Sequence, residues 1–369
     1  MPLNATMALS KSNSNRTDTA RRRQFCSYCL TLVFLSMLTL RNYPAVINSL
    51  DNSVVFVPKI NDIITLPLKP KTFKDHFYML PKKAEDGIER EKGILILFHS
   101  CKRSGLSFFH LPEERIVVKD ALKRGLAVLA PTSKLRETGC WTQTDLASID
   151  TEVDEWADAY NLTHVPRLGM GDSSGGSFLY FVYKSLKLKS MAAYNSPQSF
   201  HPDDVETNLV IPTALLSMTA DENLSSKIKL NYDKLRSVGV SSQLYSVTSH
   251  PFTPAICTAR FPEFESDDCS NIFDTIKYDF KSILDRRFFV KKKGSTILTS
   301  SQWDKFFSMI DIDYDSALKH YLKDELYPGH DWINYGIRQE LKACQGFHAF
   351  TSENHAKILD FLTVEAGIS

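Results

Sequence analysis

The sequence predicts an α/β fold in which a mostly parallel, twisted sheet is flanked by helices and carries a partly helical cap or insertion. Between residues 75 and 249, short apolar segments alternate with amphipathic helical segments, which is typical of a parallel sheet covered on both faces. From 250 to 345 the alternation stops, and proline- and acid-rich turns are followed by helical segments. We therefore expect the core to comprise residues 50–249 and 346–369, and the cap or insertion to comprise 250–345.

The predicted strands are short, mainly apolar segments bounded by turn residues. They cover residues 75–80, 93–100, 126–132, 165–172, 190–196, 211–219 and 241–248. The nearly continuous apolar run at 93–100 is typical of a strand that is buried on both faces.

The predicted helices carry apolar side chains every three or four residues. They cover residues 112–124, 144–160, 174–186, 226–237 and 350–364. Pro112, followed by two glutamates, favours the start of the first helix, and Gly125 favours its end. Helical segments such as 274–288 do not follow the alternation, which is why they are assigned to the cap or insertion.

The first forty residues have the composition of a targeting segment. Residues 1–24 form a polar leader rich in Ser, Asn, Thr and Arg, and residues 25–40 are apolar. This apolar run is shorter than the ~20 residues of a typical spanning helix and longer than most signal-peptide cores of ~7–15 residues. We expect an uncleaved signal anchor, with a signal peptide or an organelle transit peptide as alternatives. The basic residues before the run predict a single-pass protein of the secretory pathway whose remaining chain is luminal; a secreted or organelle-targeted protein is the alternative.

The overall charge argues against one class of partner. Lysine and arginine total 44, aspartate and glutamate total 43, and the net charge is +1, whereas nucleic-acid-binding proteins usually carry a basic excess. Cys26 and Cys29 form a CxxC pair, but it lies inside the apolar run, and this spacing does not recur among the other cysteines. We therefore expect no nucleic acid, no metal and no organic cofactor, and we leave the oligomeric state open.

One motif carries chemistry. Residues 171–175 (GDSSG) have the form G-x-S-x-G and lie where the predicted strand 165–172 passes into the predicted helix 174–186. A serine on such a strand-to-helix turn is exposed at the end of the sheet, and small neighbours let the backbone pass closely. The N-terminus of the following helix favours negative charge that develops beside the serine. Ser173 is therefore the predicted catalytic nucleophile.

An acid that orients the base is expected after Ser173. Asp221 follows the predicted strand 211–219 closely, so the end of that strand brings its side chain to the same edge of the sheet. It would hold the imidazole of the base in one tautomer and stabilise the imidazolium. Glu222 is the alternative.

The base is expected late in the chain, in a loop before the final helix. His348 is in that place, and it would take the proton from Ser173 and return it to the leaving group. His250, which follows the predicted strand 241–248, is the alternative. His355 lies inside the predicted final helix and is expected to be a surface residue.

Two backbone N–H groups are expected to bind the negative charge that develops on a substrate carbonyl. One belongs to Ser174, the residue after the nucleophile, and the other comes from the loop after the strand 93–100. Cys101 is the predicted second donor. Cys101 is also a candidate for a disulfide with Cys140, because both follow adjacent predicted strands.

These features resemble the α/β-hydrolase superfamily over residues 75–250 and 345–365. The resemblance rests on His99, residues 171–175, Asp221 and His348, and residues 111–114 (LPEE) and 140–141 (CW) are similar to a eukaryotic branch. It implies an eight-stranded type of sheet and a Ser-His-Asp hydrolase. The chain lacks the His-Gly-Gly of hormone-sensitive-lipase-like esterases, and it lacks the Tyr or Trp that follows the nucleophile in many prolyl-oligopeptidase-like peptidases.

The predicted function is hydrolysis of a carboxylic ester by a serine hydrolase of the EC 3.1.1 class, through an acyl-enzyme. The substrate is expected to be a small-molecule or lipid-like ester, and residues 25–40 are expected to attach the protein to a membrane. A serine peptidase or amidase with the same triad is the first alternative. A non-catalytic α/β-hydrolase-like binding protein is the second, and the complete Ser–Asp–His set argues against it.

Overall fold

The computed structural model describes residues 68–82, 91–201, 203, 209–261, 264, 266–279 and 331–368. All of them belong to one of the two units into which the chain divides, Val57–Ser369. The predicted leader at 1–24, the apolar run at 25–40 and residues 280–330 of the predicted cap lie outside the described residues. Within the described part of the chain, no helix has both the length and the apolar character needed to cross a membrane.

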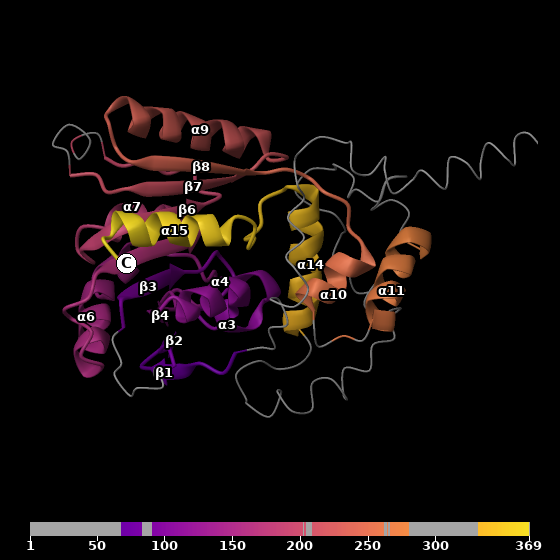
Figure 1. The fold of residues 1–369 in the computed structure, drawn as a ribbon, viewed down its shortest axis with the longest axis horizontal. Helices are drawn as coiled ribbons and strands as arrows, with labels where there is room; N and C mark the ends of the chain where they lie inside the picture. Colours follow the sequence, from indigo (N-terminus) through magenta and orange to yellow (C-terminus); the bar gives the residue numbers. More distant parts are fainter. Residues whose placement is uncertain are drawn as a thin grey trace, which may run out of the picture. The chain divides into compact units, whose positions relative to one another are not determined.

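An eight-stranded sheet forms the centre of this unit (Figure 1). Its strands are β1 (Lys71–Phe73), β2 (His76–Met79), β3 (Gly93–Phe98), β4 (Leu126–Ala130), β5 (Arg167–Asp172), β6 (Leu188–Tyr194), β7 (Thr213–Met218) and β8 (Ser242–Val247). They lie in the order β1-β2-β4-β3-β5-β6-β7-β8. β2 pairs antiparallel with β1 and with β4, and the other pairs are parallel. The mostly parallel sheet predicted from the sequence is therefore confirmed.

The sheet is buried on both faces, and each face has its own core. Because side chains alternate along a strand, Ile94, Ile96 and Phe98 of β3 belong to one core. Leu95 and Leu97 of the same strand belong to the other core. Every residue of β3 is buried, which explains why this strand is a continuous apolar run in the sequence.

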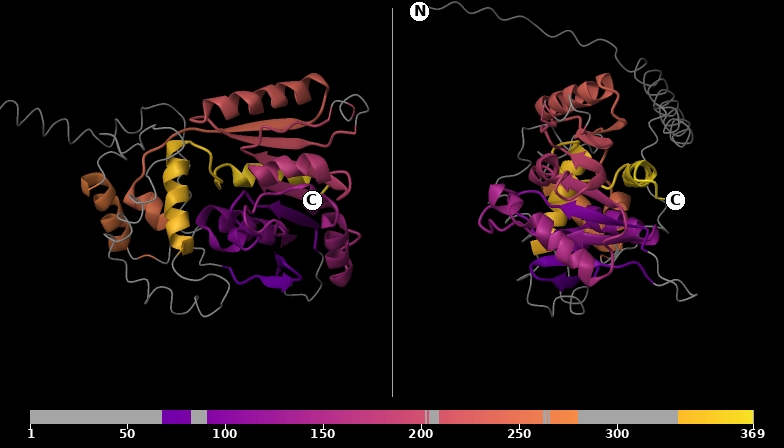
Figure 2. Two further views of the ribbon diagram at one scale, coloured as in Figure 1. Left: turned by 180° about the vertical axis from the view of Figure 1, so that it is seen from behind. Right: turned by 90° about the vertical axis from the view of Figure 1, so that its left-hand side faces the viewer.

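Helices cover both faces, as the sequence predicts. On one face, α6 (Ile149–Ala159), α7 (Ser174–Val182) and α9 (Glu222–Ser237) supply core side chains. On the other face, α3 (Ser107–His110), α4 (Pro112–Lys123) and α15 (His355–Glu365) do so. Figures 1 and 2 show the sheet and its helices from opposite sides. The largest fully buried side chain is that of Trp156 in α6, and burying a large apolar side chain stabilises the fold by about 1.5–3 kcal/mol.

Several element boundaries differ from the prediction. The sequence does not predict β1 or α3, because three or four residues carry too little periodicity to be recognised. The helix predicted at 144–160 is divided into α5 (Gln143–Leu146) and α6. The Asp145 carboxylate accepts the backbone N–H groups of Lys134 (2.7 Å) and Thr142 (2.8 Å), which ties α5 to the loop after β4.

Two further helices begin at other residues than predicted. α9 begins at Glu222 rather than 226, because the Asp221 carboxylate accepts the N–H of Leu224 (3.3 Å) and so caps the helix earlier. α15 begins at His355 rather than 350. The residues between His348 and α15 instead make long-range polar contacts that a sequence pattern does not reveal.

Part of the predicted cap or insertion is described. It contains α10 (Pro254–Arg260), α11 (Ser266–Asp274), the π-helix η2 (Thr275–Asp279) and α14 (Asp331–Gln345). A disulfide between Cys257 and Cys269 joins α10 to α11. Arg260 of α10 forms an ion pair with Glu113 at the start of α4 (2.5 Å). The segment is therefore attached to the core by a buried charge pair, and its role as a cap stays a prediction.

Candidate active site

Two of the predicted site residues follow the carboxyl ends of central strands. β3 has β4 on one side and β5 on the other, so the order in which strands are added reverses between β3 and β5. Ligands of open α/β sheets bind outside the carboxyl ends of the strands at such a point. Ser173 follows β5 directly, and Cys101 lies in the loop that follows β3.

Ser173 occupies a strained turn between β5 and α7. Its φ is 53° and its ψ is −111°, a conformation that L-residues adopt rarely and mostly at functional sites. Glycines make room for the turn. A Cβ on Gly171 would lie 2.5 Å from the Gly175 carbonyl carbon, and a Cβ on Gly175 would lie 2.1 Å from the Phe98 carbonyl oxygen. The motif therefore brings the start of α7 against the end of β3.

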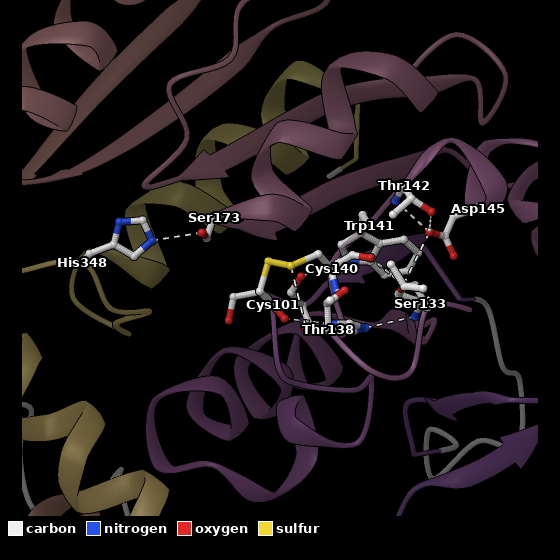
Figure 3. The surroundings of a disulfide bond; sticks show 12 residues. Cys101, Ser133, Thr138, Cys140, Trp141, Thr142, Asp145, Ser173 and His348 are labelled. Atoms are coloured by element: carbon white, nitrogen blue, oxygen red, sulfur yellow. Dashed lines mark hydrogen bonds between the residues drawn. A yellow bond between two sulfur atoms is a disulfide. The ribbon is translucent and has the colours of Figure 1, made fainter. Parts of the chain in front are cut away.

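His348 lies between Ser173 and Asp221. His348 Nε2 is 3.0 Å from Ser173 Oγ (Figure 3). On the other side of the ring, His348 Nδ1 is 3.7 Å from Asp221 Oδ2. The Ala220 N–H donates to the Gly346 carbonyl (2.8 Å), which joins the loop that carries Asp221 to the loop that carries His348. The structure thus brings together three residues that are far apart in sequence.

The alternative residues lie elsewhere. His250 Nε2 is 3.1 Å from Glu353 Oε1, and Glu222 is exposed in the first turn of α9. The prediction that His355 is a surface residue is wrong, because its side chain is only 15% exposed. It is the first residue of α15, its Nδ1 is 2.7 Å from the Ser352 carbonyl oxygen, and its Nε2 faces Asp120 of α4 (3.5 Å).

The two predicted oxyanion donors lie at the ends of β3 and β5. Ser174 is the first residue of α7, so its N–H has no acceptor within the helix. Cys101 forms a disulfide with Cys140, with a Cα–Cα distance of 4.1 Å (Figure 3). This pairing involves the sulfur atoms and not the backbone N–H of Cys101, so both roles considered for Cys101 are compatible.

His99 holds the loop after β3 in place. Its Nε2 accepts the N–H of Ser133 (3.1 Å), so the proton of the neutral ring is on Nδ1, which donates to the Ser100 carbonyl (2.9 Å). The His99 carbonyl accepts the indole N–H of Trp141 (2.8 Å). Burial lowers the pKa of His99 to about 4, so this ring is neutral at physiological pH and has a supporting role.

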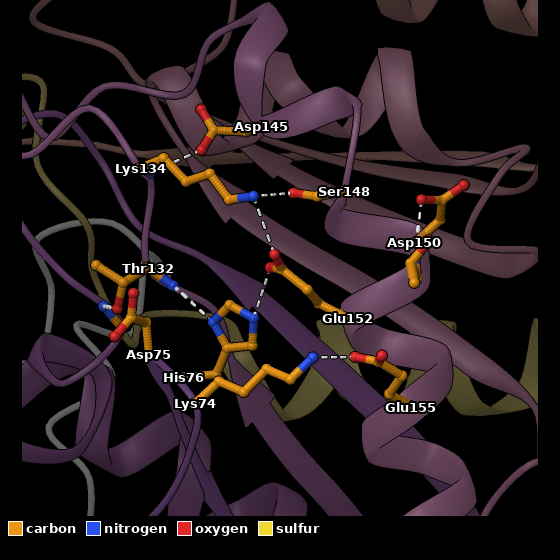
Figure 4. Close-up of polar contacts among 12 residues, drawn as sticks. Lys74, Asp75, His76, Thr132, Lys134, Asp145, Ser148, Asp150, Glu152 and Glu155 are labelled. Atoms are coloured by element: carbon orange, nitrogen blue, oxygen red, sulfur yellow. Dashed lines mark hydrogen bonds and ion pairs between the residues drawn. The ribbon is translucent and has the colours of Figure 1, made fainter.

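The loop after β4, which carries Cys140, is held by a polar network of its own (Figure 4). His76 Nδ1 accepts the N–H of Thr132 (3.4 Å), and its Nε2 is 2.9 Å from Glu152 of α6. Lys134 Nζ is 3.0 Å from the same carboxylate. Because Cys140 is bonded to Cys101, this network also restrains the loop after β3.

The neutral state of His99 predicts a pH-dependent stability. Below pH 6.5 the unfolded chain takes up a proton on His99 that the folded chain does not take up until about pH 4, so acidification favours unfolding. We expect the titration of His99 to lower the free energy of unfolding by about 1.5 kcal/mol between pH 6.5 and pH 5. Urea unfolding of the wild type and of His99→Gln, whose side chain cannot titrate, would measure this. The same pH dependence in both proteins would contradict the prediction.

The sequence reasoning missed several buried polar residues around the site. Glu114 of α4 forms an ion pair with Arg103 in the loop after β3, and both of its carboxylate oxygens accept from Gln339 Nε2 of α14 (3.0 and 2.9 Å). Burial raises the pKa of Glu114 to about 7. Two glutamates beside an N-terminal proline also fit an exposed helix start, so the sequence contains no signal that distinguishes this buried role.

Among the described residues, no group of three or more His, Cys, Asp or Glu side chains is arranged to hold a metal ion.

Comparisons with known proteins concern the fold. No protein-family model matches the chain, and no curated protein matches its sequence. Similar solved structures include a thermostable esterase (16% identity, TM-score 0.35, 49% of this chain and 55% of that chain). They also include a structure from a study of two fungal esterases of Rhizomucor miehei (13% identity, TM-score 0.36, 54% of this chain and 82% of that chain). A third is the propionate-bound esterase 2 of Thermogutta terrifontis (13% identity, TM-score 0.36, 52% of this chain and 85% of that chain). The match thus spans just over half the length of the first of these structures.

The chain has an α/β-hydrolase fold. Three features of its own topology show this: the order of the eight strands, the antiparallel β2, and the serine turn between β5 and α7.

Proposed function

We propose that the protein is a serine hydrolase that cleaves carboxylic esters through an acyl-enzyme. The observation that carries the proposal is the 3.0 Å contact between Ser173 Oγ and His348 Nε2 at a turn of positive φ. A nucleophile within hydrogen-bond reach of a base, which itself faces a carboxylate, is the arrangement that acyl transfer requires. The contact joins residues 175 positions apart.

In the proposed mechanism, Ser173 Oγ attacks the ester carbonyl while His348 Nε2 accepts its proton. The N–H groups of Ser174 and Cys101 stabilise the oxyanion of the tetrahedral intermediate. When the intermediate collapses, the alcohol leaves with the proton from His348, and the acyl group stays on Ser173. His348 then takes a proton from water, whose oxygen attacks the acyl-enzyme carbonyl. When this second intermediate collapses, the acid leaves and the proton on His348 returns to Ser173 Oγ. The 3.7 Å gap between His348 and Asp221 closes in this scheme when substrate binds, as catalytic hydrogen bonds often tighten in the complex.

Labelling with a fluorophosphonate probe tests the proposal. Wild-type protein is expected to be labelled, and Ser173→Ala is expected to show no labelling, because the probe reacts with an activated serine. A panel of p-nitrophenyl esters and aminoacyl amides separates the esterase from the peptidase. If the folded wild type is not labelled, the serine-hydrolase proposal fails, and the non-catalytic alternative takes its place. Equal labelling of Ser173→Ala would move the nucleophile to another residue.

The Cys101–Cys140 disulfide is expected to be needed for activity as well as stability. It closes a loop with a separation of 39 residues, and replacing both cysteines with serine is expected to lower the unfolding free energy by about 2–4 kcal/mol. We expect kcat for an ester to fall by about 10- to 100-fold, because the loop that carries one proposed oxyanion donor is released. The matched control is the double serine variant at Cys257 and Cys269. A kcat that falls equally in both variants would contradict the role of the first disulfide.

We also propose that the catalytic unit lies in the lumen of the secretory pathway or outside the cell, attached through residues 25–40. Two disulfides within the described residues support this, because disulfides persist in oxidising compartments. An alkaline carbonate wash of membranes measures the attachment. Release of the full-length protein by this wash would exclude a spanning anchor.

A further inference from the structure

A single buried amide lies between the segments that carry the two reacting residues. Asn195 follows β6 directly and is fully buried. Its Nδ2 donates to Asp172 Oδ1 (3.1 Å), and Asp172 immediately precedes Ser173. The same Nδ2 donates to the Ala349 carbonyl (2.7 Å), and Ala349 immediately follows His348. One side chain therefore contacts the neighbours of both the proposed nucleophile and the proposed base.

The chemistry of the two partners determines how this amide is oriented. A carboxylate and a carbonyl both accept hydrogen bonds and neither donates, so the NH₂ group of Asn195 must face them. Its two protons match the two acceptors, one each. The Asn195 Oδ1 atom is buried and has no hydrogen-bond partner among the described residues. The residue also has a φ of 49°, in the left-handed region. The unpartnered oxygen and the positive φ both cost free energy, and the two hydrogen bonds of the Nδ2 group are what the buried amide provides in return.

Other contacts hold the rest of the His348 loop, but from other elements. Gln339 of α14 donates to the Phe350 carbonyl (3.2 Å), and Glu113 of α4 accepts the N–H of Ser352. These two contacts restrain the loop against helices. Asn195 restrains it against the turn that carries Ser173, which is the relation that proton transfer depends on. A shift of about 1 Å in such a relation can lower a rate by about 100-fold.

We propose that Asn195 is a positioning residue, which holds His348 at hydrogen-bond distance from Ser173 by bridging Asp172 and Ala349. This inference rests on the proposed function of Ser173 and His348. Asn195 takes no part in proton transfer, since among the described residues its amide donates hydrogen bonds to the neighbours of the reacting pair and not to the pair itself. Its loss changes the geometry of the pair and leaves the nucleophile and the base in the chain.

Two variants and one control test the proposal in the full-length protein. Asn195→Gly removes the amide, and glycine adopts the observed φ without strain. Asn195→Asp keeps the size but replaces the donor with an acceptor that faces Asp172. The control is Ser190→Ala, on β6, the strand that Asn195 follows. It removes the bond from the buried Ser190 Oγ to the Leu362 carbonyl of α15 (2.8 Å). The control thus loses one buried bond to the C-terminal helix, but at a position remote from His348 in sequence.

The first readout is the kinetics of ester hydrolysis. We expect kcat to fall by about 10- to 100-fold in both Asn195 variants while KM changes less than about threefold, because positioning affects the chemical step. In Ser190→Ala we expect kcat to stay within about twofold of the wild type. The loss of its buried hydrogen bond is expected to lower the melting temperature of this variant, as the loss of the Asn195 bonds does in the other two. A kcat of Asn195→Gly equal to that of Ser190→Ala overturns the proposal.

The second readout does not depend on turnover. The ring resonances of His348, assigned by their loss in His348→Gln, report its contact with Ser173. We expect them to shift in Asn195→Gly and to stay unchanged in Ser190→Ala, and unchanged resonances in Asn195→Gly overturn the inference. If the wild type fails to react with a fluorophosphonate, the proposed function fails, and the ring resonances still decide whether Asn195 positions His348.

Discussion

Replacing His348 with glutamine is expected to lower kcat for ester hydrolysis by about 10⁵- to 10⁶-fold without unfolding the protein. The neutral hydroxyl of Ser173 is a weak nucleophile, and it depends on a base within reach. In the proposed mechanism, that base is the His348 Nε2 atom, which lies 3.0 Å away. A glutamine amide has no site that accepts the proton, so attack on the carbonyl loses its assistance. Rates with a p-nitrophenyl ester, together with a circular dichroism melt, measure the effect.

The comparison with Ser173→Ala makes this prediction sharper. Because nucleophile and base act as a unit, the double variant is expected to be no slower than either single variant. His250→Gln is the matched control, since His250 contacts Glu353 rather than Ser173. We expect its kcat to stay within a few-fold of the wild type. If His250→Gln loses as much activity as His348→Gln, the base has been misassigned.

Gly175→Ala is expected to destabilise the protein strongly. A Cβ at this position would lie 2.1 Å from the Phe98 carbonyl oxygen and 2.6 Å from the His99 carbonyl oxygen. Both are backbone atoms, so no side-chain rotation relieves the clash, and α7 must move away from β3. We expect a loss of about 3 kcal/mol or more in unfolding free energy, at the upper end of the effects of overpacking. Activity is expected to fall as well, because the movement separates Ser174 from the loop that carries Cys101.

The neighbouring glycine provides the control for this experiment. A Cβ on Gly176 would lie 3.0 Å or more from its nearest neighbours, a tight distance that small shifts can relieve. Gly176→Ala is therefore expected to be clearly more stable than Gly175→Ala in urea unfolding. Equal stabilities would show that the close approach of α7 to β3 is not what requires a glycine at 175.

The central strands and the serine turn were predictable because their signals are local. β3 is buried on both faces and is therefore a continuous apolar run. The turn at Ser173 needs small residues at fixed offsets, and these are visible as a five-residue motif. Asp221 was predictable as a candidate because it lies just after an apolar strand. In each case the structural requirement falls within a few neighbouring residues.

Other features were not predictable, because they depend on contacts between distant segments. Asn195 contacts Ala349 across 154 positions, and neither residue belongs to a recognisable motif. His355 was expected on the surface because helical spacing alone does not show that α15 packs beside Asp120 of α4. The division of the helix predicted at 144–160 follows from bonds that Asp145 makes with the loop after β4.

The sequence by itself determined the alternation of strands and helices, the position of the serine turn and the order of the candidate acid and base, because each of these depends on local periodicity or chain order. Only the tertiary structure decided that His348 rather than His250 faces Ser173, that Cys101 pairs with Cys140, and that Asn195 links the two loops of the site. The physical reason is that these choices are made by hydrogen bonds and disulfides between segments that are separated in the chain and meet only at the carboxyl edge of the folded sheet.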